Sequence, residues 1–214
     1  MEPLVSPRII AVEGIDASGK STQTDLLAEH FTARGLAVEV RSFPRYDSFF
    51  GRHIRALLDG TGASTAHDLD PRSMALWFAM DRWQSFTASC DADVLLLNRY
   101  TLSNAVYQAS RLPDQVGDEL FSWILDLEHR VLGLPEPQLT VVLDVDVDVS
   151  STRAAARAEQ QGATPDVYER ATGLLTASRR RYRSAGEHVA NLHVVDVTGR
   201  TPGDVAGEIR LLVS

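Results

Sequence analysis

The chain has 214 residues and a formal net charge of −8, and 44% of its residues are hydrophobic while 23% are charged. This length and composition are typical of one soluble globular domain. The excess of acidic residues argues against nonspecific nucleic-acid binding, which requires a positive surface to release counterions from phosphates. Lys20 is the single lysine among the 21 basic residues, and the others are arginines.

The sequence shows no sign of a membrane anchor or of export. The longest uninterrupted hydrophobic run covers 74–80, whereas a membrane-spanning helix needs about 20 residues. Glu2 stands where a signal peptide needs basic residues, and no hydrophobic core follows it. Cys90 is the single cysteine, so no internal disulfide can form. We therefore expect a cytoplasmic protein without membrane or nucleic-acid partners.

Hydrophobic runs and helix-ending residues predict strands that alternate with helices along the chain. The expected strands cover about 8–13, 36–42, 94–97, 139–144 and 192–197. The expected helices cover about 21–34, 51–58, 70–89, 103–110, 114–132, 150–160, 166–184 and 202–212. This alternation predicts an α/β fold, in which helices flank a parallel sheet of about five strands. No linker divides the chain, so residues 1–214 are expected to form one domain.

Residues 14–21 match the phosphate-loop pattern G-x-x-x-x-G-K-[ST] completely, between the first expected strand and the first expected helix. The glycines allow successive backbone N–H groups to converge on a phosphate. Lys20 would contact the β and γ phosphates, and the Ser21 hydroxyl can bind Mg²⁺. A broad guanidinium could not replace the compact ammonium here. The expected ATP-binding residues are Gly14, Ile15, Asp16, Ala17, Ser18, Gly19, Lys20, Ser21 and Thr22.

A phosphate loop alone does not distinguish a kinase from a switch GTPase or a motor. Guanine-specific switches normally carry Asn-Lys-x-Asp, which this chain cannot form, because its single lysine already lies in the phosphate loop. The further motifs are Phe43-Pro44-Arg45-Tyr46, Asp81-Arg82, Asn98-Arg99-Tyr100, Ser103-Asn104 with Tyr107, and Tyr168-Glu169. With these motifs in this order, nearly the whole chain resembles the thymidylate kinase family. The resemblance implies a phosphate-loop α/β fold, a homodimer, and transfer of the γ-phosphoryl group of ATP to dTMP.

The resemblance also implies where dTMP binds. Phe78 would stack on thymine and Arg82 would face a thymine carbonyl, and their spacing of four places both on one helical face. Spacing alone favours a core residue for Phe78, with Arg82 at the surface as the alternative, and the resemblance reverses this interpretation. Asn104 would contact the pyrimidine edge and Tyr107 the sugar, although ordinary packing is an alternative for Tyr107. The expected dTMP site comprises Asp16, Phe43, Pro44, Arg45, Tyr46, Phe78, Arg82, Arg99, Asn104, Tyr107 and Tyr168.

Arginines are the expected partners of the acceptor phosphate and of the transferred group. Arg99 follows a central strand, where ligands bind in open α/β sheets, and with Arg45 it could clamp the dTMP phosphate. Arg153 and Arg157 precede a polar segment, so we expect a lid at about 150–166, with a solvated helix face as the alternative. A mobile arginine can contribute roughly 10³ to 10⁵ in rate. The expected catalytic residues are Lys20, Asp16, Arg99, Arg153 and Arg157.

Asn98 is the one departure from the family pattern, which generally has aspartate there. The amide keeps an oxygen acceptor but loses the negative charge near the metal. We therefore expect Ser21, Asp16 and Glu169 to hold Mg²⁺. Two alternatives stay open: another phosphate-loop nucleotide or nucleoside kinase, and a catalytically impaired nucleotide-binding protein.

Overall fold

The computed structural model describes residues 7–161 and 166–213 of the chain. Within these residues, five parallel strands form one sheet in the order β2-β3-β1-β4-β5. The strands are β1 (Arg8–Glu13), β2 (Val38–Ser42), β3 (Val94–Asn98), β4 (Leu139–Asp144) and β5 (Leu192–Asp196). The five-stranded parallel sheet expected from the sequence is confirmed.

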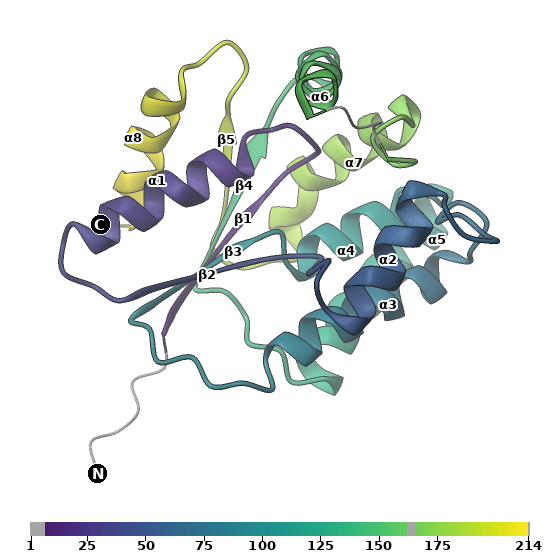
Figure 1. Cartoon of the computed structure of the whole chain (residues 1–214), viewed down its shortest axis with the longest axis horizontal. Helices are drawn as coiled ribbons and strands as arrows, with labels where there is room; N and C mark the ends of the chain where they lie inside the picture. The colour runs from purple at the N-terminus through teal and green to yellow at the C-terminus, as the bar shows by residue number, and fades with distance from the viewer. Residues whose placement is uncertain (1–6, 162–165, 214) are drawn as a thin grey trace.

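Helices cover both faces of this sheet (Figure 1). They are α1 (Lys20–Thr32), α2 (Phe49–Asp59), α3 (Pro71–Ser85), α4 (Thr101–Ala109), α5 (Asp114–Asp126), α6 (Val147–Gln161), α7 (Thr172–Ser184) and α8 (Pro202–Val213). Two short segments add a π-helical turn, η1 (Leu127–Val131), and a 3₁₀ turn, η2 (Ala185–Glu187). Helices α1 and α8 pack together on one face, and α4 and α7 lie on the other. The strands β1, β3 and β4 are buried almost throughout, as their continuous hydrophobic runs predict.

The register of the central strands determines where the motifs meet. Val12 of β1 pairs with Asn98 of β3, and Glu13 pairs with Val142 of β4. The phosphate loop after β1 therefore lies beside Arg99 after β3, at the carboxyl edge of the sheet. Ligands of open α/β sheets bind in the crevice outside this edge.

The expected helix at 166–184 is wrong in its first six residues. Asp166 and Glu169 instead form a capping box: Asp166 Oδ1 accepts from the Glu169 N–H at 2.9 Å, and Glu169 Oε2 accepts from the Asp166 N–H at 3.0 Å. The turn that follows ends at Ala171, whose ψ of 80° is not helical, and α7 begins at Thr172. Most other boundaries differ by one to four residues, as helix and strand ends commonly do. In the predicted lid, 162–165 lie outside the described residues.

The expected long helix at 114–132 is also interrupted. The α-helical pattern of α5 ends at Asp126, and η1 continues the same helical path with wider hydrogen bonding. Such π-helical turns occur often at functional sites. Among the described helices, none is both long and apolar enough to cross a membrane.

Candidate active site

The phosphate loop connects β1 to α1 in a conformation that its glycines permit. Gly14 has a φ of 136°, and a Cβ there would lie 2.6 Å from the carbonyl oxygen of Leu143. Gly19 has a φ of 98° and directly precedes α1. Because neither conformation suits a side chain, the loop can bring its N–H groups and the positive end of α1 to one place.

The ammonium of Lys20 lies against this loop. Its Nζ donates to the carbonyl oxygen of Ile15 at 2.7 Å and to that of Gly14 at 3.2 Å. Burial of the side chain, and next the positive charge of Arg99, lower the pKa of Lys20 to about 7 from its ordinary value of 10.5. An approaching phosphate would favour the charged form of this lysine, because an opposite charge raises the pKa of an ammonium.

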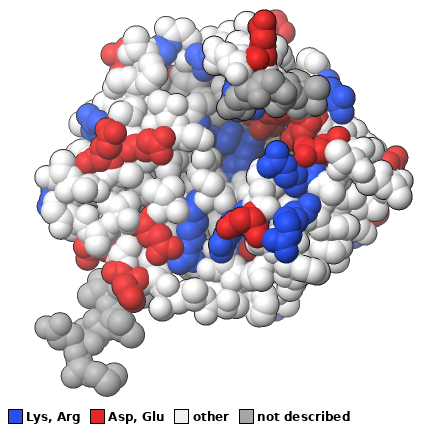
Figure 2. Space-filling view, viewed as in Figure 1, with Lys and Arg blue, Asp and Glu red and all other residues white. Residues whose placement is uncertain are grey.

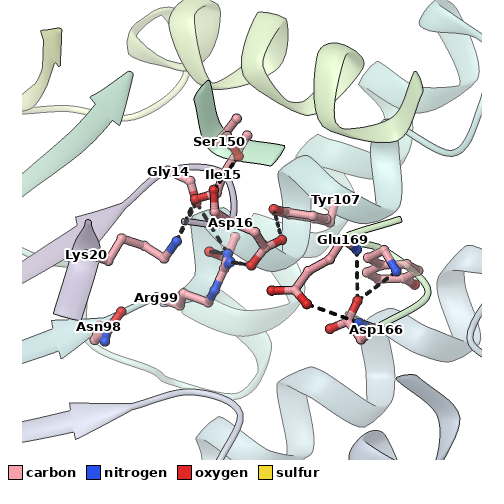
Figure 3. A network of polar contacts seen from close by, with 12 residues as sticks. Gly14, Ile15, Asp16, Lys20, Asn98, Arg99, Tyr107, Ser150, Asp166 and Glu169 are labelled. Carbon is pink, nitrogen blue, oxygen red and sulfur yellow. Dashed lines mark hydrogen bonds and ion pairs between the residues drawn. The ribbon is translucent and has the colours of Figure 1, made fainter. Parts of the chain in front are cut away.

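Asp16, Arg99 and Tyr107 form a second polar cluster next to the lysine (Figure 3). The Arg99 guanidinium makes an ion pair with Asp16 Oδ1, and the Tyr107 hydroxyl donates to Asp16 Oδ2 at 2.7 Å. Burial alone would raise the pKa of Asp16, but Arg99 and Lys20 hold it below its ordinary value. Burial and the charge of Asp16 keep the Tyr107 hydroxyl protonated, since they raise its pKa. Asp16 therefore fixes the orientation of the charged Arg99 side chain.

The phosphate loop opens onto a polar cavity, the donor cavity, whose floor and walls carry basic side chains (Figure 2). From the predicted ATP site, the lining includes Asp16, Ala17, Ser18, Gly19, Lys20, Ser21 and Thr22. Arg153 and Arg157 of α6 also line the donor cavity. Arg157 pairs with Glu169, whereas Arg153 has no hydrogen bond or ion pair to any described residue. Arg153 is therefore available to an anion in this cavity.

A second hollow, the acceptor cavity, lies beside the first. All residues of the predicted dTMP site line it except Arg45. The two cavities share Asp16, Phe43, Pro44, Tyr46, Arg99 and Asp166. The arginine–aspartate pair thus stands at the junction between the phosphate loop and the acceptor cavity.

Arg82 and Phe78 both contribute to the acceptor cavity from α3. Arg82 is only 2% exposed, so it is not the surface residue that its spacing alone would allow. Its Nε and Nη2 groups donate to the two carboxylate oxygens of Glu128 at 2.5 and 2.6 Å. No described residue accepts a hydrogen bond from its third nitrogen, Nη1.

The structure does not bring Arg45 to the two cavities. Its backbone N–H donates to the buried carboxylate of Asp81 at 2.8 Å, which fixes the Phe43–Tyr46 segment. Its side chain lies in a separate groove along the edge strand β2, with Nη2 3.8 Å from Asp47. A role for Arg45 at the acceptor phosphate stays a prediction that would require this side chain to move.

The predicted metal ligands lie around the donor cavity but are already engaged. Both oxygens of Asp16 are bonded to Arg99 and Tyr107, and both oxygens of Glu169 are bonded to Arg157 and the Asp166 N–H. Mg²⁺ usually keeps several waters and takes few protein ligands beside substrate phosphates. Ser21 fits the pattern of a single protein ligand beside substrate phosphates, because its hydroxyl lies at the phosphate loop. This hydroxyl accepts a hydrogen bond from Asn98 Nδ2 at 3.0 Å.

This contact leads to a prediction for Asn98→Asp. A carboxylate would accept from the Ser21 hydroxyl instead of donating to it, and it would add a negative charge beside a bound cation. We expect kcat to stay level or to rise by up to about tenfold, with a lower Mg²⁺ requirement, as hydrogen bonds to charged groups are stronger. Initial rates over a Mg²⁺ titration would measure this, and a fall of more than tenfold would mean that the site depends on the amide.

Several lining residues carry no motif that the sequence would show. Asp166 lines the acceptor cavity, and burial with the nearby charge of Asp16 raises the pKa of Asp166 to about 6. Gln108 lines it too, four residues after Asn104, so helical spacing could have indicated it. The far side of the donor cavity is formed by Val197, Arg200, Pro202 and Val205, which follow the last strand.

Comparison with known proteins places this geometry in a family. The model of the family described as thymidylate kinase matches residues 12–208. The chain belongs to the thymidylate kinase family. The match includes the phosphate loop and every motif on which the resemblance rested.

Individual relatives agree with this family. A thymidylate kinase of Mycobacterium tuberculosis is 35% identical over 168 residues, which cover 76% of this chain and 78% of that protein. A Pyrococcus horikoshii protein named "Probable thymidylate kinase" is 28% identical over 209 residues, covering 95% and 94%. A solved structure of thymidylate kinase from Candida albicans superposes with a TM-score of 0.75 over 97% of this chain and 91% of that chain, at 22% identity. The last comparison shows that the family fold is shared.

Proposed function

We propose that the chain is a thymidylate kinase, which transfers the γ-phosphoryl group of ATP to dTMP and releases dTDP and ADP. Membership of the thymidylate kinase family supports this activity. The observation that carries the proposal is the junction of two cavities at Asp16 and Arg99, one built on the phosphate loop and one lined by aromatic and amide side chains. This arrangement suits two nucleotides that meet through their phosphates.

The donor cavity would take ATP with Mg²⁺. Loop N–H groups and Lys20 would bind the β and γ phosphates, as in phosphate-loop enzymes generally. Bound Mg²⁺ would neutralise phosphate charge, held by Ser21 and, through water, by Asp16. Arg153 and Arg157 would stabilise the transferring group from a lid at about 150–166, within one domain spanning 1–214. No protein base is needed, because the acceptor phosphate is already anionic at neutral pH.

The acceptor cavity would take dTMP. Phe78 supplies a ring for stacking on the base. Asn104 Oδ1 and Gln108 Nε2 are buried without a hydrogen-bond partner among the described residues, although both residues line the cavity. Buried polar atoms normally find partners, and a pyrimidine with both N–H and C=O groups would supply them. Arg99 would bind the acceptor phosphate at the junction.

We further propose a homodimer in the cytoplasm. Leu76 and Trp83 are exposed on α3 at a spacing of seven residues, and Val116 and Trp123 are exposed on α5 at the same spacing. Exposed apolar helix faces of this kind are typical of protein–protein interfaces. A cytoplasmic location agrees with the proposed use of ATP. It also agrees with the single cysteine, which cannot form an internal disulfide. Sedimentation of the purified chain at micromolar concentration should give the mass of a dimer.

An acceptor panel tests the proposed function. With ATP and Mg²⁺, ADP release would be compared for dTMP, dUMP, UMP, dCMP and thymidine. We expect the highest kcat/KM for dTMP. Faster phosphorylation of free thymidine would instead assign a nucleoside kinase. Tight binding of ATP and dTMP by calorimetry without ADP release would assign a nucleotide-binding protein that has lost catalysis.

A further inference from the structure

Glu128 lies beneath the acceptor cavity and does not line it. The residue belongs to the π-helical turn η1 and its side chain is 0% exposed. One carboxylate oxygen, Oε1, accepts from Arg82 Nη2 at 2.6 Å and from Asn104 Nδ2 at 2.7 Å, and the other, Oε2, accepts from Arg82 Nε at 2.5 Å. A single buried carboxylate therefore holds two side chains that line the cavity.

The contacts of Asn104 allow its amide only one orientation. Nδ2 donates to Glu128 Oε1 and also to the carbonyl oxygen of Ala75 at 3.0 Å. Both neighbours are pure acceptors, so a reversed amide would set its oxygen against two other oxygens and lose both hydrogen bonds. The amide oxygen Oδ1 consequently faces away from Glu128, where it is buried and has no partner among the described residues.

The carboxylate of Glu128 is also the counter-ion of the buried Arg82 guanidinium. Arg82 is 2% exposed, and a buried guanidinium needs a paired and hydrogen-bonded counter-ion. The bidentate pair occupies Nε and Nη2, which fixes the guanidinium plane and leaves Nη1 without a partner in the described chain. Glu128 thus fixes an acceptor, Asn104 Oδ1, and a donor, Arg82 Nη1, on two side chains that line the acceptor cavity.

We propose that Glu128 is a positioning residue that selects the acceptor base through Asn104 and Arg82. This inference rests on the proposed function. A fixed acceptor and a fixed donor in the same cavity are complementary to thymine or uracil, whose N3–H donates while the neighbouring O4 accepts. Cytosine has the opposite pattern, because its N3 accepts and its N4 amino group donates. A site with buried polar groups rejects a base that leaves them unpaired.

The orientation of Asn104 can be tested in the unmodified protein. The chain has three asparagines, Asn98, Asn104 and Asn191, so labelling with ¹⁵N-asparagine gives three pairs of side-chain amide signals. Variants Asn98→Asp and Asn191→Gly assign them by elimination. We expect the Asn104 amide protons to exchange with solvent at least about 100-fold more slowly than those of exposed Asn191, since they are buried donors. Equal exchange rates would overturn the fixed orientation.

The role of Glu128 is tested by E128Q. Glutamine has nearly the same size but offers one acceptor and one donor, so it cannot satisfy Arg82 and Asn104 together. We expect the ratio of kcat/KM for dTMP over dCMP to fall by about tenfold or more, the size of about one hydrogen bond. Arg130→Gln is the matched control, because Arg130 lies in the same π-helical turn, is exposed and pairs with Asp126. It should leave the ratio unchanged.

These outcomes separate the positioning role from a structural role and from the proposed function. If E128Q lowers kcat/KM for dTMP and dCMP by the same factor, Glu128 merely supports the fold and the proposal is wrong. If E128Q does not fold, the exchange rates of the Asn104 amide protons in the unmodified protein decide whether Asn104 is held in one orientation. If the unmodified protein accepts dCMP as readily as dTMP, the proposed function and the selection of the base both fail, whereas an equal loss on both acceptors in E128Q contradicts only the role of Glu128.

Discussion

Replacing Lys20 with alanine is expected to lower kcat for dTMP by about 10³-fold or more while the fold is retained. Phosphoryl transfer depends on positioning and on neutralising charge, and loss of one such contact typically costs two or more orders of magnitude. Lys20 is the single lysine of the chain and the one ammonium at the phosphate loop. An arginine elsewhere in the sequence cannot supply a compact charge at this place.

The fold should survive this substitution because the buried ammonium is not a stabilising charge in the absence of nucleotide. A pKa lowered to about 7 means that burial opposes the charged form. As the folded-state pKa lies below the unfolded value of 10.5, the unfolded chain binds more protons between these values, so the destabilising effect of Lys20 decreases as the pH rises from 7 to 10.5. At pH 7 and below, Lys20→Ala should therefore unfold at a temperature equal to or above that of the unmodified protein.

Steady-state ADP release and thermal unfolding measure both expectations on the same samples. Lys20→Arg is the control for charge without the compact ammonium, and it should be nearly as inactive as Lys20→Ala. Unchanged activity of the alanine variant would remove the argument that residues 14–21 bind the donor phosphates. A cooperative transition lost in both variants would instead mean that Lys20 is needed for folding.

The sheet and the phosphate loop were predictable because their signals are local. Continuous hydrophobic runs such as 94–97 indicate strands buried on both faces, and the phosphate-loop pattern occupies eight consecutive positions whose backbone geometry the glycines permit. The acceptor cavity was predictable through motif order in the family. Ten of the eleven residues that the resemblance assigns to dTMP binding line this cavity. The contact of each with dTMP stays a prediction.

The parts that were missed depend on pairs far apart in sequence. Glu128 bonds to Arg82 across 46 residues, and no local pattern marks it, since the α-helical periodicity of 114–132 passes through it without a break. Arg45 looked suited to a phosphate by residue type, but Asp81 holds its backbone and leaves its side chain on the outside of the sheet edge. The false helix start at Asp166 has a different, local origin, because the capping box of Asp166 and Glu169 is a helix signal that here closes only a single turn.

Arg99→Met is expected to lower kcat/KM for dTMP by about 10³-fold. Arg99 is the cation at the junction of the two cavities, and its φ of 63° and its ion pair with Asp16 hold it there. Methionine keeps most of the side-chain volume but removes the guanidinium that matches phosphate oxygens. Arg34→Met is the matched control, because Arg34 is exposed at the end of α1 and lines neither cavity, and it should retain full activity.

A loss in Arg99→Met has two possible causes, which a double variant separates. Arg99 could bind the acceptor phosphate directly, or it could merely neutralise Asp16, whose unpaired carboxylate would then repel that phosphate. If neutralisation were the whole role, Asp16→Asn combined with Arg99→Met would recover most of the activity of Asp16→Asn alone. We expect the double variant to be less than tenfold more active than Arg99→Met. The phosphate contact of Arg99 is lost whether residue 16 is aspartate or asparagine. A double variant as active as Asp16→Asn would show that Arg99 acts on Asp16 and that another cation binds the acceptor phosphate.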